Sequence, residues 1–77
     1  MNDDEGIALS LNNVGLILFK QGKINEAYRY VIRSMETAKK LGYPENIKYA
    51  AYTLKLIYKN QRKYKDALEM YELEIQM

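Results

Sequence analysis

Apolar residues recur every three or four positions along four stretches of the chain, the spacing that places side chains on one face of an α-helix. In the first stretch they are Ile7, Leu11, Val14 and Leu18. Acidic residues precede this stretch, where they complement the positive end of a helix. The pattern predicts a first helix from about residue 5 to residue 21.

A second helix is predicted from about Asn25 to Leu41. Its stripe contains small and branched apolar residues, namely Ala27, Val31, Met35, Ala38 and Leu41. Gly42 can adopt the left-handed conformation that ends many helices, and Pro44 cannot continue one. We therefore expect a turn over residues 42–44.

Two further helices are predicted in the second half. The third spans about residues 45–61 and repeats the spacing of the first, with Ile47, Ala51, Leu54 and Tyr58. The fourth begins near Lys65, and its stripe consists of Ala67, Leu68, Tyr71 and Ile75. No Gly or Pro follows in residues 72–77, so we expect this helix to run to the chain end within a longer protein.

The two halves match when the sequence is shifted by 40 residues. The identical pairs include Ile7/Ile47, Leu16/Leu56, Ile17/Ile57, Gln21/Gln61, Lys23/Lys63 and Ala27/Ala67. Other pairs keep their chemistry, such as Val14 with Leu54. Each half is thus a helix–turn–helix unit with a face that only a stacked neighbour can bury. We expect one all-α domain over residues 1–77, built from two stacked antiparallel hairpins.

The repeated residues resemble the tetratricopeptide repeat family, in a form whose repeats recur at about 40 rather than about 34 residues. Repeat one, about residues 5–42, carries the signature positions Leu11, Val14, Gly15, Leu18, Ile24 and Ala27. Repeat two, about residues 45–77, keeps Leu54, Tyr58, Tyr64 and Ala67. The glycine and alanine allow two helices to approach closely, and the isoleucine fills the turn.

The second repeat departs from this signature at two positions. Lys55 stands where the first repeat has Gly15, and Arg62 stands where it has Gly22. Because a lysine cannot pack flush between two helices, its charged head must reach outward along its stem. We expect a looser second hairpin.

The resemblance implies a protein–protein interaction scaffold or adaptor module of a larger signalling or regulatory protein. Its partner or peptide would bind a concave groove lined by the first helix of each repeat. The candidate groove residues are Leu9, Asn12, Asn13, Leu16, Phe19, Lys20, Tyr49, Tyr52, Thr53, Leu56, Lys59 and Asn60. Asn13 matches the family position that often holds a peptide backbone, since a carboxamide both donates and accepts hydrogen bonds. The alternative is that Asn13 is an ordinary solvated helix residue.

The first predicted helix carries more apolar residues than one helical partner requires. Either an upstream repeat covers Leu9, Leu16 or Ile17, or these residues form an apolar peptide groove. Both alternatives leave apolar surface exposed on this chain alone, so we expect self-association, such as a homodimer through the first helix. A purely structural spacer is a related alternative.

Tyrosine is abundant, with eight residues against one phenylalanine and no tryptophan. Rings at helical spacing usually cover a core, and we assign Tyr58, Tyr64 and Tyr71 to that role. Tyr49 and Tyr52 are the tyrosines that we expect to be available to a partner, because a tyrosine combines a large apolar area with a polar tip.

Composition excludes most catalytic chemistry. The chain has no cysteine and no histidine, so disulfides, thiolate nucleophiles and imidazole bases are absent. Neither Ser10 nor Ser34 has a histidine to activate it, and no glycine-rich phosphate loop is present. We expect no enzymatic activity, no metal and no cofactor.

Charge leaves one further alternative open. The net charge is only +2, but no acid lies between Glu45 and Asp66 while six basic residues do. Nucleic-acid binding is the less favoured interpretation, because a recognition helix would begin with Arg, Asn or Gln rather than with Lys65 and Asp66. The longest apolar run, residues 16–19, is too short to span a membrane, and no secretory signal opens the chain. We expect a cytoplasmic protein.

Overall fold

The computed structural model describes residues 4–76 and is all-helical over that range. Its four helices are α1 (Asp4–Lys20), α2 (Ile24–Leu41), α3 (Pro44–Asn60) and α4 (Tyr64–Gln76). Each begins one residue before its predicted start, and the ends of α1, α2 and α3 agree with prediction to within one residue. Met77, where the fourth helix was expected to run out, lies outside the described residues.

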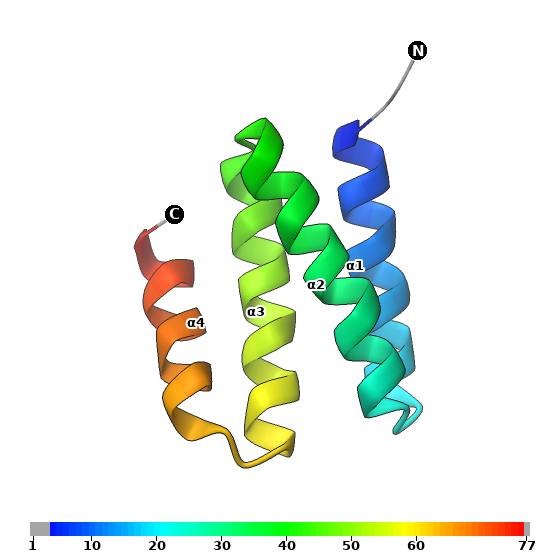
Figure 1. Ribbon diagram of the computed structural model, residues 1–77, viewed down its shortest axis with the longest axis vertical. Coiled ribbons are helices and arrows are strands. Elements are labelled where there is room, and N and C mark those ends of the chain that lie inside the picture. The colour runs from blue at the N-terminus through cyan, green and yellow to red at the C-terminus, as the bar shows by residue number, and fades with distance from the viewer. Residues whose placement is uncertain (1–3, 77) are drawn as a thin grey trace.

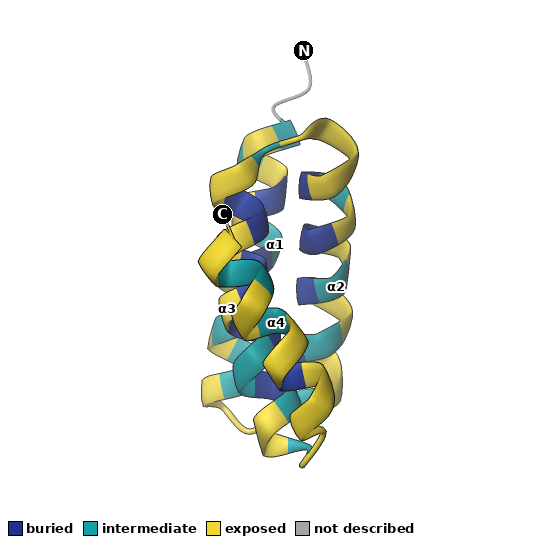
Figure 2. Ribbon diagram, turned by 90° about the vertical axis from the view of Figure 1, so that its left-hand side faces the viewer, coloured by how far each residue is buried: buried dark blue, intermediate teal, exposed yellow. Residues whose placement is uncertain are grey.

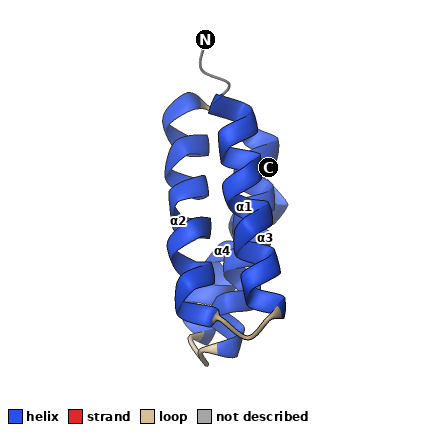
Figure 3. Ribbon diagram, turned by 90° about the vertical axis from the view of Figure 1, so that its right-hand side faces the viewer, coloured by secondary structure: helices blue, strands red, loops and turns tan. Residues whose placement is uncertain are grey.

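The helices form two antiparallel hairpins that lie side by side (Figure 1). α1 packs on α2, α3 packs on α4, and α3 joins the hairpins by contacting both α1 and α2. Within the described residues, α1 and α4 do not meet. The loops are short, as Figure 3 shows, so each helix reverses the direction of the one before it.

All three turns use the same local geometry, repeated every 20 residues. A residue with positive φ stands in each turn: Gly22 at 80°, Gly42 at 70° and Arg62 at 61°. The next backbone N–H then donates to a carbonyl five residues earlier, over 2.9 Å at Lys23, 3.0 Å at Tyr43 and 2.8 Å at Lys63. This bond closes the helix end and places the following helix antiparallel.

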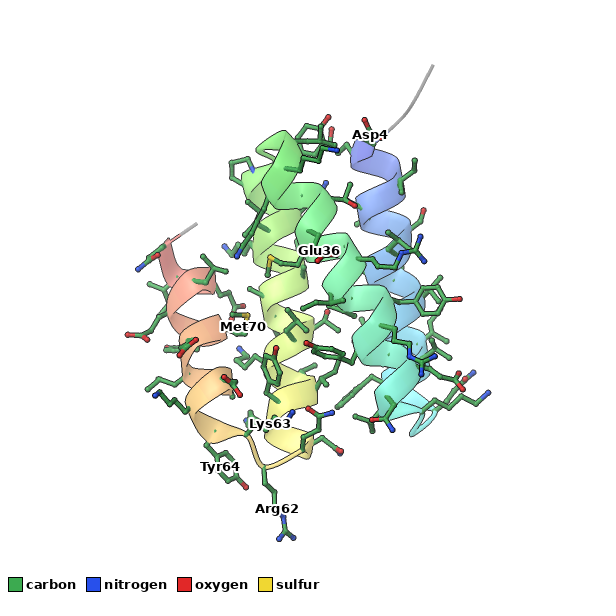
Figure 4. All side chains as sticks on the ribbon, in the orientation of Figure 1. Asp4, Glu36, Arg62, Lys63, Tyr64 and Met70 are labelled. Atoms are coloured by element: carbon green, nitrogen blue, oxygen red, sulfur yellow. The ribbon has the colours of Figure 1, made fainter. Side chains whose placement is uncertain are left out.

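Arg62 is the strained member of this set, because side chains with a Cβ seldom adopt the left-handed conformation. Figure 4 shows its side chain pointing away from the helices at the base of the molecule, so its replacement removes no packing. We expect Arg62→Gly to raise the free energy of unfolding by roughly 0.5–1 kcal/mol, because relief of strain exceeds the added entropy of the unfolded chain. Urea denaturation measures this change.

Two variants are controls for that measurement. Arg62→Ala removes the charge but keeps a Cβ in the strained conformation, so it should leave stability nearly unchanged. Gly22→Ala should be destabilising even though its Cβ would meet open space, because φ there is 80°. Equal stability of Arg62→Gly and Arg62→Ala would contradict the argument from strain.

The core lies between α1, α2 and α3. Its fully buried large side chains are Val31, Leu54 and Ile57. In α1 the buried residues are small or polar, namely Ala8, Asn12 and Gly15. A Cβ on the glycine would overlap Cγ2 of Val31 and lie 3.2 Å from the carbonyl oxygen of Ala27. Small residues therefore set the distance between α1 and α2.

This burial corrects the predicted face of α1. Ile7 and Val14 were expected on the inner stripe, but they are 48% and 40% exposed. The close approach of α2 admits only the small residues of α1, so these larger side chains lie on another face. Leu18 and Ile24 do pack against the core, as the repeat signature implies.

Buried polar side chains join the helices. The Ser34 hydroxyl of α2 donates to the Ala8 carbonyl of α1 over 2.6 Å. The Asn46 amide of α3 donates to the Glu5 carbonyl of α1 over 3.4 Å. Since a buried hydroxyl or amide without a partner is costly, these bonds favour one alignment of the helices.

The second hairpin packs less deeply than the first, as expected from Lys55. Among the described residues of α4, only Ala67 is buried. Nζ of Lys55 forms an ion pair with Glu74 over 2.9 Å and lies 4.9 Å and 5.3 Å from the ring centroids of Tyr52 and Tyr71. In the first hairpin, Gly15 allows the backbones of α1 and α2 to approach closely. In the second hairpin, the lysine side chain fills the equivalent space between α3 and α4.

The outer face of α4 corrects a second prediction. Tyr64 and Tyr71 were assigned to the core, yet they are 64% and 48% exposed. Leu68 and Ile75, on the same predicted stripe, are also exposed. The inner face is formed instead by Ala67 with residues such as Met70, which Figure 4 shows between α4 and α3. No described helix covers the outer face.

Tyr58 is the one predicted core tyrosine that packs against the core. Its ring is tilted by 57° against that of Tyr28 in α2, with centroids 6.1 Å apart. Burial, followed by the hydrogen bond with the Tyr28 side chain, raises the pKa of Tyr58 from 10.0 to about 12, and the negative charges of Asp66 and Glu69 add to this.

This shift predicts a loss of stability in alkali. Because the pKa of Tyr58 is higher in the folded state than in the unfolded state, its contribution to stability is complete below pH 10 and falls as the pH rises toward about 12. Urea unfolding over this range should show a steeper decline for the wild type than for Tyr58→Phe, which has no phenol to ionise. Parallel declines would contradict the prediction.

Candidate functional site

A groove runs between α1 and α3, the first helices of the two repeats. Its cavity of about 350 Å³ is lined by Leu9, Asn12, Asn13, Leu16, Tyr49, Tyr52 and Thr53. All seven lie among the groove residues that the sequence predicts. They come from about two turns of α1 and little more than one turn of α3, near the middle of the pair.

The other predicted groove residues lie outside this cavity. Phe19 packs against the core, and Leu56 is half-buried. Lys20 and Asn60 are exposed beyond the groove, while Lys59 lines a second cavity. Each of the five lies at least three residues C-terminal to the last residue of its helix that lines the cavity. The prediction thus also includes residues toward the turns, beyond the part of the groove that this cavity occupies.

The floor of the groove is polar. Asn12 is only 6% exposed, and its Oδ1 has no hydrogen-bond partner among the described residues. Thr53 is 1% exposed, and its hydroxyl donates to the Tyr49 carbonyl of its own helix over 3.2 Å. The floor therefore contains an unpartnered acceptor on Asn12, which a ligand N–H could satisfy once a turn of this side chain exposes the oxygen.

The walls and rim are largely apolar and accessible. Leu9, Tyr49 and Tyr52 are between 41% and 47% exposed, and Asn13 is exposed beside them. None of the seven lining residues is charged. The arrangement can hold an uncharged segment that places apolar side chains against the rings and a backbone N–H toward the floor.

A second cavity, of about 380 Å³, lies between α3 and α4. Its lining residues are Lys55, Lys59, Tyr64, Ala67, Leu68 and Tyr71. Sequence reasoning did not identify this surface, because it assigned both tyrosines to the core. The available signal was the stripe of Tyr64, Leu68, Tyr71 and Ile75, which the four predicted helices do not cover.

Other kinds of site are not evident in residues 4–76. No three carboxylates gather there in a group that could hold a metal ion. None of the four helices combines the length and the apolarity that crossing a bilayer requires.

Comparison with known proteins agrees with the geometry of the paired hairpins. The sequence of residues 6–77 matches the tetratricopeptide repeat family. Comparisons with curated proteins and with solved structures gave no match. Members of this family are generally protein–protein interaction modules and typically non-catalytic. The family match covers nearly the whole chain, and the same turn hydrogen bond recurs at equivalent positions of the two repeats. The chain belongs to the tetratricopeptide repeat family.

Proposed function

We propose that this chain binds an uncharged, extended segment of a partner protein in the groove between α1 and α3. The observation that carries the proposal is the Asn12 Oδ1, which is buried in the groove floor without a hydrogen-bond partner. A buried acceptor left unsatisfied costs about 1–3 kcal/mol, so a backbone N–H that reaches it gains that amount on binding.

The residues around Asn12 supply the remaining contacts. Asn13, exposed at the rim, can donate and accept with a second peptide unit. Tyr49 and Tyr52 offer ring faces to an apolar side chain, and interface energies often concentrate on such rings. Because the lining carries no charge, the preferred segment is apolar rather than acidic, and its binding should depend little on salt.

Selection from a displayed library of linear peptides, followed by calorimetry with the selected peptides, tests this proposal. Asn13→Ala and Tyr49→Ala should each weaken binding by about tenfold or more. Arg29→Ala, at an exposed site on α2, is the control and should bind as the wild type does.

A third variant separates binding from stability. Asn12→Leu removes the unsatisfied acceptor with a side chain of similar length, so the protein should be at least as stable as the wild type while its peptide affinity falls. Peptides that bind all groove variants with unchanged affinity, or a library that yields no binder, would overturn the proposal.

A second candidate function is self-association through α1. The observation that favours it is an exposed apolar stripe formed by Ile7, Val14 and Ile17, which lines neither cavity. We propose that this stripe pairs two copies of the chain in solution. The proposed setting for both functions is the cytoplasm, within a signalling or regulatory protein.

A further inference from the structure

The two hairpins meet at one junction, which has a docking side on α3 and a receiving side on α1 and α2. By the 40-residue repeat, the exposed surfaces at the two ends of the stack correspond to these two sides. α3 meets the first hairpin with a buried stripe of Ile47, Leu54 and Ile57, each at most 8% exposed. The residues 40 positions earlier are Ile7, Val14 and Ile17 of α1, which are between 40% and 56% exposed. α1 thus displays the face by which α3 docks.

The opposite end displays the receiving surface. The cavity between α3 and α4 is lined by six residues whose counterparts 40 positions earlier are Gly15, Phe19, Ile24, Ala27, Tyr28 and Val31. All six counterparts are buried or half-buried, and Tyr28 contacts Tyr58 of α3 directly. In repeat two, four of the same positions are exposed, namely Lys59, Tyr64, Leu68 and Tyr71. Figure 2 shows α4 toward the viewer with much of its surface exposed.

We infer that a second copy of this chain docks its α1 onto the α3/α4 surface, so that the junction between the hairpins repeats between molecules. This inference rests on the self-association proposed above and adds the other half of its interface. By the 40-residue correspondence, Ile17 of one copy takes the place of Ile57, and Leu68 of the other takes the place of Tyr28.

Charge is compatible with this junction. The stripe on α1 is uncharged, and the receiving surface carries two lysines, Lys55 in place of Gly15 and Lys59 in place of Phe19. Glu74 pairs with the ammonium group of Lys55, and the rings of Tyr52 and Tyr71 flank it. At Lys55 the incoming helix therefore meets an aliphatic stem and two rings rather than an unpaired charge. Lys59 is exposed, so its stem can lie along the interface while its ammonium group stays in water.

Such an interface is heterologous, because one copy contributes α1 and the other contributes α3 and α4. A docked pair leaves one α1 end and one α3/α4 end free, so association continues beyond two copies unless these ends meet in a ring. A symmetric pair made by two α1 stripes would instead stop at a dimer. The two arrangements therefore differ in stoichiometry as well as in the residues they need.

Two single variants test the arrangement, each blocking one end at an exposed position. Ile17→Lys blocks the docking stripe, and Leu68→Lys blocks the receiving surface, at residues 56% and 57% exposed. Tyr30→Lys on α2 is the matched control, because the equivalent junction contains no contact between α2 and α4. Light scattering after size exclusion, from about 5 to about 500 µM, measures the mass.

For the wild type and Tyr30→Lys, the measured mass should rise above that of a dimer as the concentration increases. Each blocking variant alone should associate at least about tenfold more weakly. Mixing the two blocking variants should give a heterodimer, because each retains the end that the other lacks. Loss of association with Ile17→Lys alone, with Leu68→Lys unaffected, would overturn the head-to-tail arrangement and leave self-association through α1 standing. A wild type that stays monomeric would overturn both.

Discussion

Replacing Ile57 by alanine is expected to lower the free energy of unfolding by about 2–5 kcal/mol, while the same change at Ile17 costs less than about 1 kcal/mol. The two isoleucines occupy the same position in their repeats, and both stand on the first helix of a hairpin. Ile57 is completely buried, whereas Ile17 is 56% exposed. The difference comes from the cavity that the shorter side chain leaves in a packed core, which an exposed site does not suffer.

Urea denaturation monitored by circular dichroism, at a protein concentration low enough to keep the chain monomeric, measures both variants. The pair is well matched because residue type, helix position and helix propensity change are the same at both sites. Similar losses at the two positions would mean that α1 is covered in solution, and would contradict the burial described for the isolated chain.

The second large effect is expected at Gly15. Gly15→Lys introduces the residue that repeat two carries at this position, and should cost about 3 kcal/mol or more, because the side chain must enter the contact with Val31 and Ala27. Lys55 is tolerated in the second hairpin because Glu74 pairs with it there. The counterpart of that glutamate in the first hairpin is Ser34, which is buried and already bonded to Ala8.

A double-mutant cycle identifies the cause of the loss at Gly15. Gly15→Ala should also be destabilising, by a smaller amount, since one methyl group overlaps Cγ2 of Val31. Val31→Ala removes that atom, so the double variant should be more stable than the sum of the two single losses implies. Additive losses would mean that the Val31 contact does not limit the approach of α1 and α2.

Helix positions follow from local sequence signals, and those signals are strong in this chain. Gly42 and Pro44 mark one turn, and the repeated polar segments around Gly22 and Arg62 mark the others. Because each turn depends on residues within five positions of one another, its place can be predicted without knowing the tertiary structure. The all-α fold with two antiparallel hairpins is confirmed on that basis.

The faces of the helices were harder to predict, because apolar spacing does not say which stripe meets which neighbour. α1 has apolar residues on most of its circumference, so the buried stripe of Ala8, Asn12 and Gly15 is not the most hydrophobic one. On α4 the large residues Tyr64 and Tyr71 face outward, on a side that no other described helix covers. The residues in the middle of the groove could be predicted, because residues three or four apart on α1 and on α3 lie on the same side of each helix. The length of the groove could not, because it depends on how the two helices pack.

The way the helices meet also bears on how the chain folds and opens. Every contact between helices joins elements that are adjacent or next but one in the chain, and α1 and α4 do not meet within the described residues. Contacts so close in sequence favour fast folding, and a stack linked only through neighbours can lose one end while the rest stays folded. Amide hydrogen exchange should therefore be slowest in α2 and α3 and fastest in α4, which opens before the remainder of the domain unfolds.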